Sequence, residues 1–101
     1  MVQVVPNRTE IEGTVVSRSA HPTLKDFDLL EVDVERAAQV PGFSDLISSN
    51  FGSRIQVAVR RDLLPSGPIE GAHIHGRAWV GGPGALFAEP LPESATSLVT
   101  S

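Results

Sequence analysis

The stretch Phe27–Arg36, FDLLEVDVER, decides the fold of this protein because its apolar and charged side chains alternate. The apolar side chains of this stretch are Leu30, Val32 and Val34, and the acidic ones between them are Glu31, Asp33 and Glu35. Successive side chains of a β-strand point to opposite faces, so this period of two predicts a strand with one buried face and one wet face. Such strands are typical of antiparallel sheets.

Four further segments alternate in the same way, over residues 11–15, 54–60, 71–80 and 85–89. The side chains that we expect to point inward from the first four strands are Ile11, Val15, Leu30, Val32, Val34, Ile55, Val57, Val59, Ile74 and Ala78. The Gly-rich residues 81–84 join the last two segments closely and predict a hairpin. The sequence therefore predicts five short strands and an all-β fold.

The remaining segments are connections. The longest, residues 37–53, predicts one short helical turn, with Ser44 as its cap and Gly52 just past its end. Residues 91–101 are mostly small and hydroxyl-bearing, and we expect them to form a loose C-terminal tail. The chain has 101 residues, which fits a single domain, and we place that domain at residues 1–90.

Five strands are too few for a sandwich of the usual ~7 strands. A flat sheet would need helices to cover its apolar face, and the sequence contains too little helical material for that. A sheet closed on itself buries its apolar face and leaves no edges. Glycines at two inward positions, Gly13 and Gly76, allow the tight coiling that a small barrel needs. We therefore predict a small, closed or partly open, five-stranded antiparallel barrel.

This pattern resembles the oligonucleotide/oligosaccharide-binding (OB) fold. The residues that carry the resemblance are Ile11-Glu12-Gly13-Thr14-Val15, Leu30-x-Val32-x-Val34, Gly52-x-x-Ile55-x-Val57-x-Val59, and Ile69-x-Gly71 before Ile74-x-Gly76-x-Ala78. The resemblance covers residues 8–90 and implies a ligand on the outer face of the second and third strands, framed by neighbouring loops. The chain departs from the fold at residues 61–70, where a helix is usual, because Pro65 and Pro68 interrupt them. A plain five- or six-stranded barrel is the alternative.

The net charge of the chain counts against binding to nucleic acid. The sequence has 8 Lys and Arg residues and 12 Asp and Glu residues, which gives a formal net charge of -4. The outer face of the second strand is acidic, and the outer face of the neighbouring third strand carries the basic side chains of Arg54 and Arg60. We expect these arginines to pair across the strands with the acids. If the chain binds single-stranded nucleic acid instead, Arg54 and Arg60 are the residues that contact phosphates. The chain has no Cys, which excludes disulfides, thiolate nucleophiles and zinc sites built on Cys.

The fourth strand turns one row of side chains outward, namely His73, His75, Arg77 and Trp79. Trp and Arg are residue types that anchor protein interfaces. The four Phe residues are expected to fill the barrel and its loop cover, with Phe87 in the core. We therefore expect the row on the fourth strand to bind a protein partner or a second copy of the chain. In an alternative, Trp79 covers the barrel end beneath residues 90–101.

The pair His73-x-His75 is also a weak candidate for metal binding, because both imidazoles lie on one side of a strand with Cβ atoms roughly 7 Å apart. A site needs a third ligand, and only two are visible. The carboxylates of Glu10 and Glu12 on the first strand either complete a shell or pair with His75 and Arg77. We favour pairing, and expect neither a metal nor another cofactor.

The sequence contains no recognisable catalytic motif. Ser17 and Ser19 precede His21, but no Gly-rich oxyanion motif accompanies them, so they do not indicate a nucleophile and base. The sequence thus predicts a non-catalytic, OB-like binding module for a protein partner or a homo-oligomer. Single-stranded nucleic acid is the alternative ligand, and a metal-binding or enzymatic role of His73 and His75 comes third. No run approaches the ~20 apolar residues that cross a membrane, and the first residues lack a signal-peptide pattern, so we expect a soluble cytoplasmic protein without a membrane partner.

Overall fold

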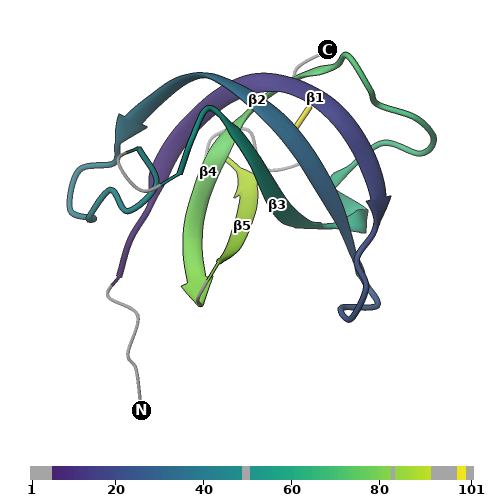
Figure 1. The fold of residues 1–101 in the computed structure, drawn as a ribbon, viewed down its shortest axis with the longest axis horizontal. Coiled ribbons are helices and arrows are strands. Elements are labelled where there is room, and N and C mark those ends of the chain that lie inside the picture. The colour runs from purple at the N-terminus through teal and green to yellow at the C-terminus, as the bar shows by residue number, and fades with distance from the viewer. Residues whose placement is uncertain (1–5, 49–50, 83, 92–97, 100–101) are drawn as a thin grey trace.

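The computed structural model describes residues 6–48, 51–82, 84–91 and 98–99. Its strands are β1 (Thr9–Ala20), β2 (Phe27–Gln39), β3 (Arg54–Arg60), β4 (His73–Gly82) and β5 (Ala85–Pro90). One 3-10 turn, η1 (Arg61–Leu63), follows β3 directly. Figure 1 shows the long β1 and β2 arching over the shorter β3, β4 and β5. The predicted all-β class is confirmed, and none of the described helical residues forms a span long and apolar enough to cross a membrane.

The strands follow one another around a ring in the order β1-β2-β3-β5-β4, and β4 pairs back to β1. Neighbours are antiparallel except β3 and β5, which pair in parallel through Ala58 and Phe87. The predicted antiparallel pairing is therefore present at every neighbouring pair except this one. An odd number of strands cannot alternate in direction all the way round a closed ring, so one pair must be parallel. The segment that contains β4 supplies the long crossover that a parallel pair requires.

The core lies inside the ring and consists of the predicted side chains. All of the expected inward residues are buried except Val34, which is half-buried and packs against the core. Leu30, Val57 and Ile74 are fully buried, with 0% of their surface exposed. A slip of one residue in any strand would have turned these side chains to solvent, so the predicted register is confirmed.

Gly13 and Gly76 sit where two strands approach too closely for a side chain. A Cβ on Gly13 would collide with the backbone carbonyl of Asp33, and one on Gly76 would collide with the carbonyl of Glu89 and with the side chain of Leu98. At Gly13 the β1–β2 register also shifts, which marks a bulge. These glycines therefore serve the tight coiling that was expected of them.

Gly13→Ala is expected to lower the free energy of unfolding by about 1–3 kcal/mol, because the obstructing atom belongs to the backbone of β2 and cannot turn aside. Gly52→Ala is the matched control, since a Cβ there meets nothing within 4 Å and should change stability little. Urea unfolding followed by Trp79 fluorescence measures both variants. Equal midpoints for the two variants would contradict this explanation of Gly13.

The connection between β2 and β3 has one i→i+4 bond where a short helical turn was expected, since the Phe51 N–H donates to the Ile47 carbonyl at 3.0 Å. Its residues 49–50 lie outside the described residues, and the one helix among the described residues is η1. Asp45 rather than Ser44 acts as the cap, because its Oδ1 accepts the N–H groups of Ile47 and Ser48 and the hydroxyl of Thr9. Ser44 pairs with Asn7 as an isolated bridge, which ties the connection to the residues just before β1.

The C-terminal segment contributes to the core at Leu98, which is fully buried. Its N–H donates to the carbonyl of Leu63, its carbonyl accepts the N–H of His75, and Val99 forms a bridge with Ile74. Within the segment expected to be loose, Leu98 and Val99 are thus packed on β4. The expectation for residues 92–97 and 100–101 falls outside the described residues.

Candidate binding surface

The outer face of the ring carries a stack of side chains across three neighbouring strands. Trp79 on β4 stacks on Phe87 on β5, its partner in register, with ring centroids 5.8 Å apart and planes at 20°. The guanidinium carbon of Arg8 lies 4.4 Å from the centre of the Trp79 ring. Because β4 lies between β1 and β5, Arg8 and Phe87 reach Trp79 from opposite sides.

The start of β1 holds Arg8 in this position. The side-chain amide of the buried Asn7 donates to the carbonyl of Val80, 3.1 Å away, and its Oδ1 accepts the Val80 N–H at 2.7 Å. The backbone pairing of β1 with β4 begins at Thr9 and Ala78, and the Asn7 side chain adds a further pair of bonds to the backbone of β4 beyond it. Arg8, the next residue, therefore lies beside Trp79.

The stack continues at both ends. The Arg8 guanidinium also lies 5.5 Å from the ring centre of Phe43, and the Phe27 ring meets Phe87 edge-on at 6.1 Å and 79°. We call these five residues, Phe43, Arg8, Trp79, Phe87 and Phe27, the aromatic row. Each is half-buried, so each keeps part of its surface available for contact.

The aromatic row corrects the expectation for the phenylalanines. Of the four, Phe51 packs against the core, whereas Phe27, Phe43 and Phe87 lie on the outside. The phase of β5 explains Phe87, because its neighbours Leu86 and Ala88 are the buried ones. The alternation of β5 therefore turns Phe87 outward, although a Phe side chain is of a type that usually fills a core.

A groove adjoins the row, and its lining residues come from β2, β3, η1, β4 and β5. It has a volume of about 500 Å³, and its lining includes Phe27, Leu63, Trp79, Gly81 and Phe87. The apolar lining and the fixed rings suit an apolar side chain of a ligand.

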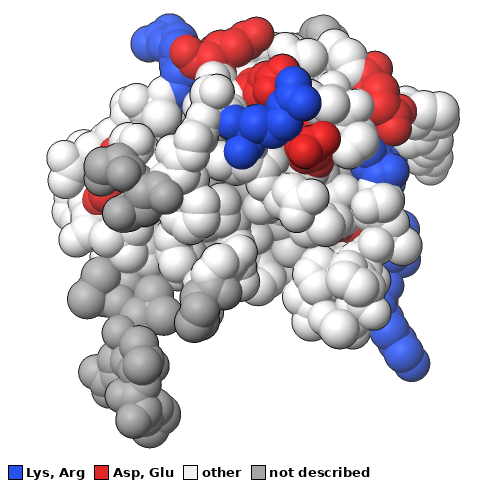
Figure 2. Space-filling view, in the orientation of Figure 1, with Lys and Arg blue, Asp and Glu red and all other residues white. Residues whose placement is uncertain are grey.

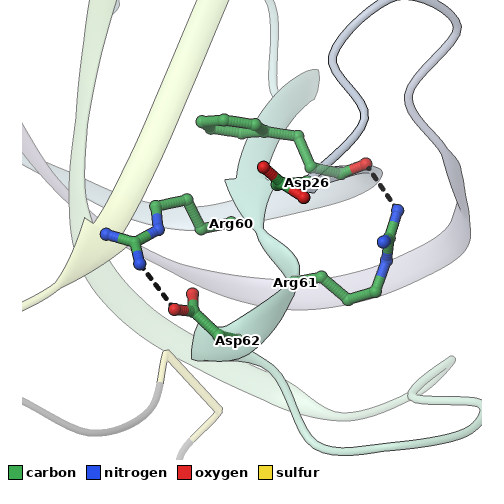
Figure 3. A pocket seen from close by; sticks show the side chains of 5 residues that line it. Asp26, Arg60, Arg61 and Asp62 are labelled. Carbon is green, nitrogen blue, oxygen red and sulfur yellow. Dashed lines mark hydrogen bonds and ion pairs between the residues drawn. The ribbon is translucent and has the colours of Figure 1, made fainter.

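Arg60 lines both this groove and a neighbouring, more open hollow of about 640 Å³. Arg60 and Arg61 point to opposite sides of the chain there (Figure 3). Arg60 donates to Asp62 at 2.5 Å, whereas Arg61 donates to Asp28 and to the carbonyls of Lys25 and Phe27. Both arginines are therefore already paired.

Asp28 is the buried charge that fixes this end of the ring. Its side chain is 8% exposed and accepts bonds from Arg18 Nε at 2.7 Å and Arg61 Nε at 3.0 Å. Burial alone would raise the pKa of Asp28, but the hydrogen bonds and charges of the two arginines outweigh burial, and the pKa lies below its ordinary value. Arg18 also donates to the carbonyls of Pro65 and Gly67, so the network ties the β3–β4 connection to β1.

The outer face of β2 and β3 shows acidic and basic side chains interspersed (Figure 2). Arg54 binds Asp33 through two bonds, at 2.7 and 3.0 Å, as the cross-strand reading predicts. Arg60 pairs instead with Asp62, two residues along the chain. This face is a solvated, internally paired surface.

The remaining predicted site residues lie along β4. His75 Nε2 is 2.7 Å from Glu10 Oε2, so the expected pairing of His75 is present. Arg77 lies between Glu10 on β1 and Glu89 on β5 in register, but its buried Nε makes no hydrogen bond. Of the predicted outward residues on β4, Trp79 alone belongs to the aromatic row.

Among the described residues, no group of three or more His, Asp or Glu side chains is placed so that it could hold a metal ion. No protein-family model, no curated protein and no solved structure matches the chain.

Proposed function

We propose that this chain is a non-catalytic binding module of the OB type that holds a protein segment on the aromatic row and in the adjoining groove. The five-stranded ring, in the order β1-β2-β3-β5-β4, supports the OB assignment, because that fold is a five-stranded, partly open barrel. The half-buried, prestacked aromatic row is the observation that carries the proposal.

A protein ligand suits this row because its chemistry is that of interface anchors. Trp, Phe and Arg are enriched in the buried centres of protein interfaces, and Lys and Glu are depleted there. Trp79 is held between Arg8 and Phe87, so little side-chain freedom remains to be lost on binding. The groove beside it accepts an apolar side chain from the partner.

Single-stranded nucleic acid is the second candidate, because the resembled fold binds oligonucleotides and the row contains aromatic rings. Bases require open ring faces, and phosphates require unpaired cations. Both faces of Trp79 are occupied, Arg54 is bound to Asp33, and Arg60 is bound to Asp62. These contacts favour protein over nucleic acid.

The proposal is tested by selecting peptides from a random displayed library on the wild-type chain. We expect selected peptides to shift the NMR signals of Trp79, Phe87 and Phe27, and mixed-sequence single strands at low salt to shift none of them. A light-scattering mass measured at micromolar concentration shows separately whether the ligand is a second copy. Tight, salt-sensitive binding of single strands with no selected peptide would overturn the proposal.

A further inference from the structure

A second cluster lies on the outer face of β1 and β4, apart from the aromatic row. Glu12 stands opposite His75 in register, and His73 lies two residues away on the same face of β4. Glu12 Oε2 is 3.5 Å from His73 Nε2, and Glu12 Oε1 is 3.7 Å from His75 Nε2. One carboxylate therefore lies within reach of two imidazoles that come from a single strand.

These distances are close to those between the ligands of a tetrahedral metal ion. With metal–ligand bonds of about 2.0–2.1 Å, two ligand atoms at neighbouring corners lie about 3.3 Å apart. The two nitrogen–oxygen distances in the cluster, 3.5 and 3.7 Å, are only slightly longer, and each runs to a different oxygen of Glu12, so the carboxylate has to turn to bind an ion together with both rings. Because imidazole and carboxylate are the ligands of many zinc sites, the matching ion is Zn²⁺.

The cluster has to close before it can hold an ion, since its side chains do not yet converge. Glu10 Oε2, 2.7 Å from His75 Nε2, holds that nitrogen and must turn aside or become the fourth ligand. The side chain of Arg36, 3.7 Å from Glu12 and 80% exposed, can swing into water. The exposed fractions of the His73, His75 and Glu12 side chains are 41%, 26% and 27%, so they can adjust without disturbing the core.

We propose that His73, His75 and Glu12 bind one divalent transition-metal ion of the Zn²⁺ class through the two Nε2 atoms and the carboxylate. Glu10 then either becomes the fourth ligand or turns aside from His75 Nε2. The sequence showed the two histidines and offered Glu10 and Glu12 as further ligands, and the β1–β4 register places Glu12 opposite His75. This site is independent of the proposed function, because it uses no residue of the aromatic row.

Calorimetric titration of the untagged, full chain with ZnCl₂ tests the proposal. We expect one ion per chain, and Co²⁺ in its place should give the visible absorption of a tetrahedral site. His73→Ala, His75→Ala and Glu12→Gln should each weaken Zn²⁺ binding at least about tenfold. His21→Ala is the matched control and should bind as the wild type does, because His21 Nδ1 accepts the N–H groups of Thr23 and Leu24 within its own loop.

Circular dichroism of the metal-free variants separates loss of binding from loss of fold, and surface substitutions of this kind should leave the spectra unchanged. The proposal is overturned if the wild type takes up no Zn²⁺ at a free concentration of about 100 μM. A site with a Kd of about 1 μM would be saturated at that concentration. Unchanged Zn²⁺ affinity in a His73→Ala/His75→Ala double variant would overturn it as well.

Discussion

Asp28→Ala is expected to lower the free energy of unfolding by about 3–5 kcal/mol, the usual cost of removing one partner of a buried ion pair. Arg18, whose side chain is 13% exposed, would keep its charge without the carboxylate that neutralises it. The β3–β4 connection would also be held less firmly, since Arg18 donates to two of its carbonyls. Urea unfolding at neutral pH measures the loss.

Asp33→Ala is the matched control, because Asp33 stands on the same strand and also pairs with an arginine. Its side chain is 47% exposed, and exposed pairs contribute little to stability. A loss at Asp28 no larger than the loss at Asp33 would contradict the role assigned to burial.

The stabilisation from Asp28 should also depend on pH. Its pKa is lower in the folded chain than the ordinary value of 3.8, so folding favours the ionised carboxyl. The contribution is therefore complete above the unfolded pKa and is lost as the pH falls through the folded one. We expect the stability difference between the wild type and Asp28→Asn to be largest near neutral pH and to shrink below about pH 4. A difference that does not change with pH would contradict this linkage.

Leu98→Ala is expected to cost about 2–5 kcal/mol, as for other fully buried leucines. Leu98 fills the space above Gly76, where even a Cβ would collide with its side chain. Leu24→Ala is the control, because the 36% exposed Leu24 has little packing to lose and should change stability by at most about 0.5 kcal/mol. Thermal and urea unfolding of the two variants should rank them clearly. Similar stabilities would mean that Leu98 does not belong to the core.

The strand faces were predictable because alternation is a local property. Leu30, Val32 and Val34 reveal their face from their own spacing, whatever lies beside them. Closure into a ring followed from the lack of helices to cover the apolar face. The parallel β3–β5 pair was missed, although five strands in a closed ring require one such pair.

The aromatic row was only partly predictable. Trp79 and Phe87 could be placed outward by phase, but their stacking depends on the β4–β5 register. Arg8 reaches Trp79 because Asn7 binds Val80, a contact between residues 73 positions apart. Leu98 was missed for a similar reason, since nothing local in a small, polar segment marks one leucine as a core residue.

The central claim is that the aromatic row binds a protein segment, and the affinity of a selected peptide for Trp79→Ala tests it most directly. Calorimetry should show binding weakened by about thirtyfold or more, because loss of an interface anchor costs ~2 kcal/mol or more. Phe27→Ala, at the other end of the row, should weaken binding in the same direction. Arg54→Ala, on the internally paired face of β3, should bind as the wild type does. Unchanged affinity in both folded row variants, or a loss confined to Arg54→Ala, would contradict the claim.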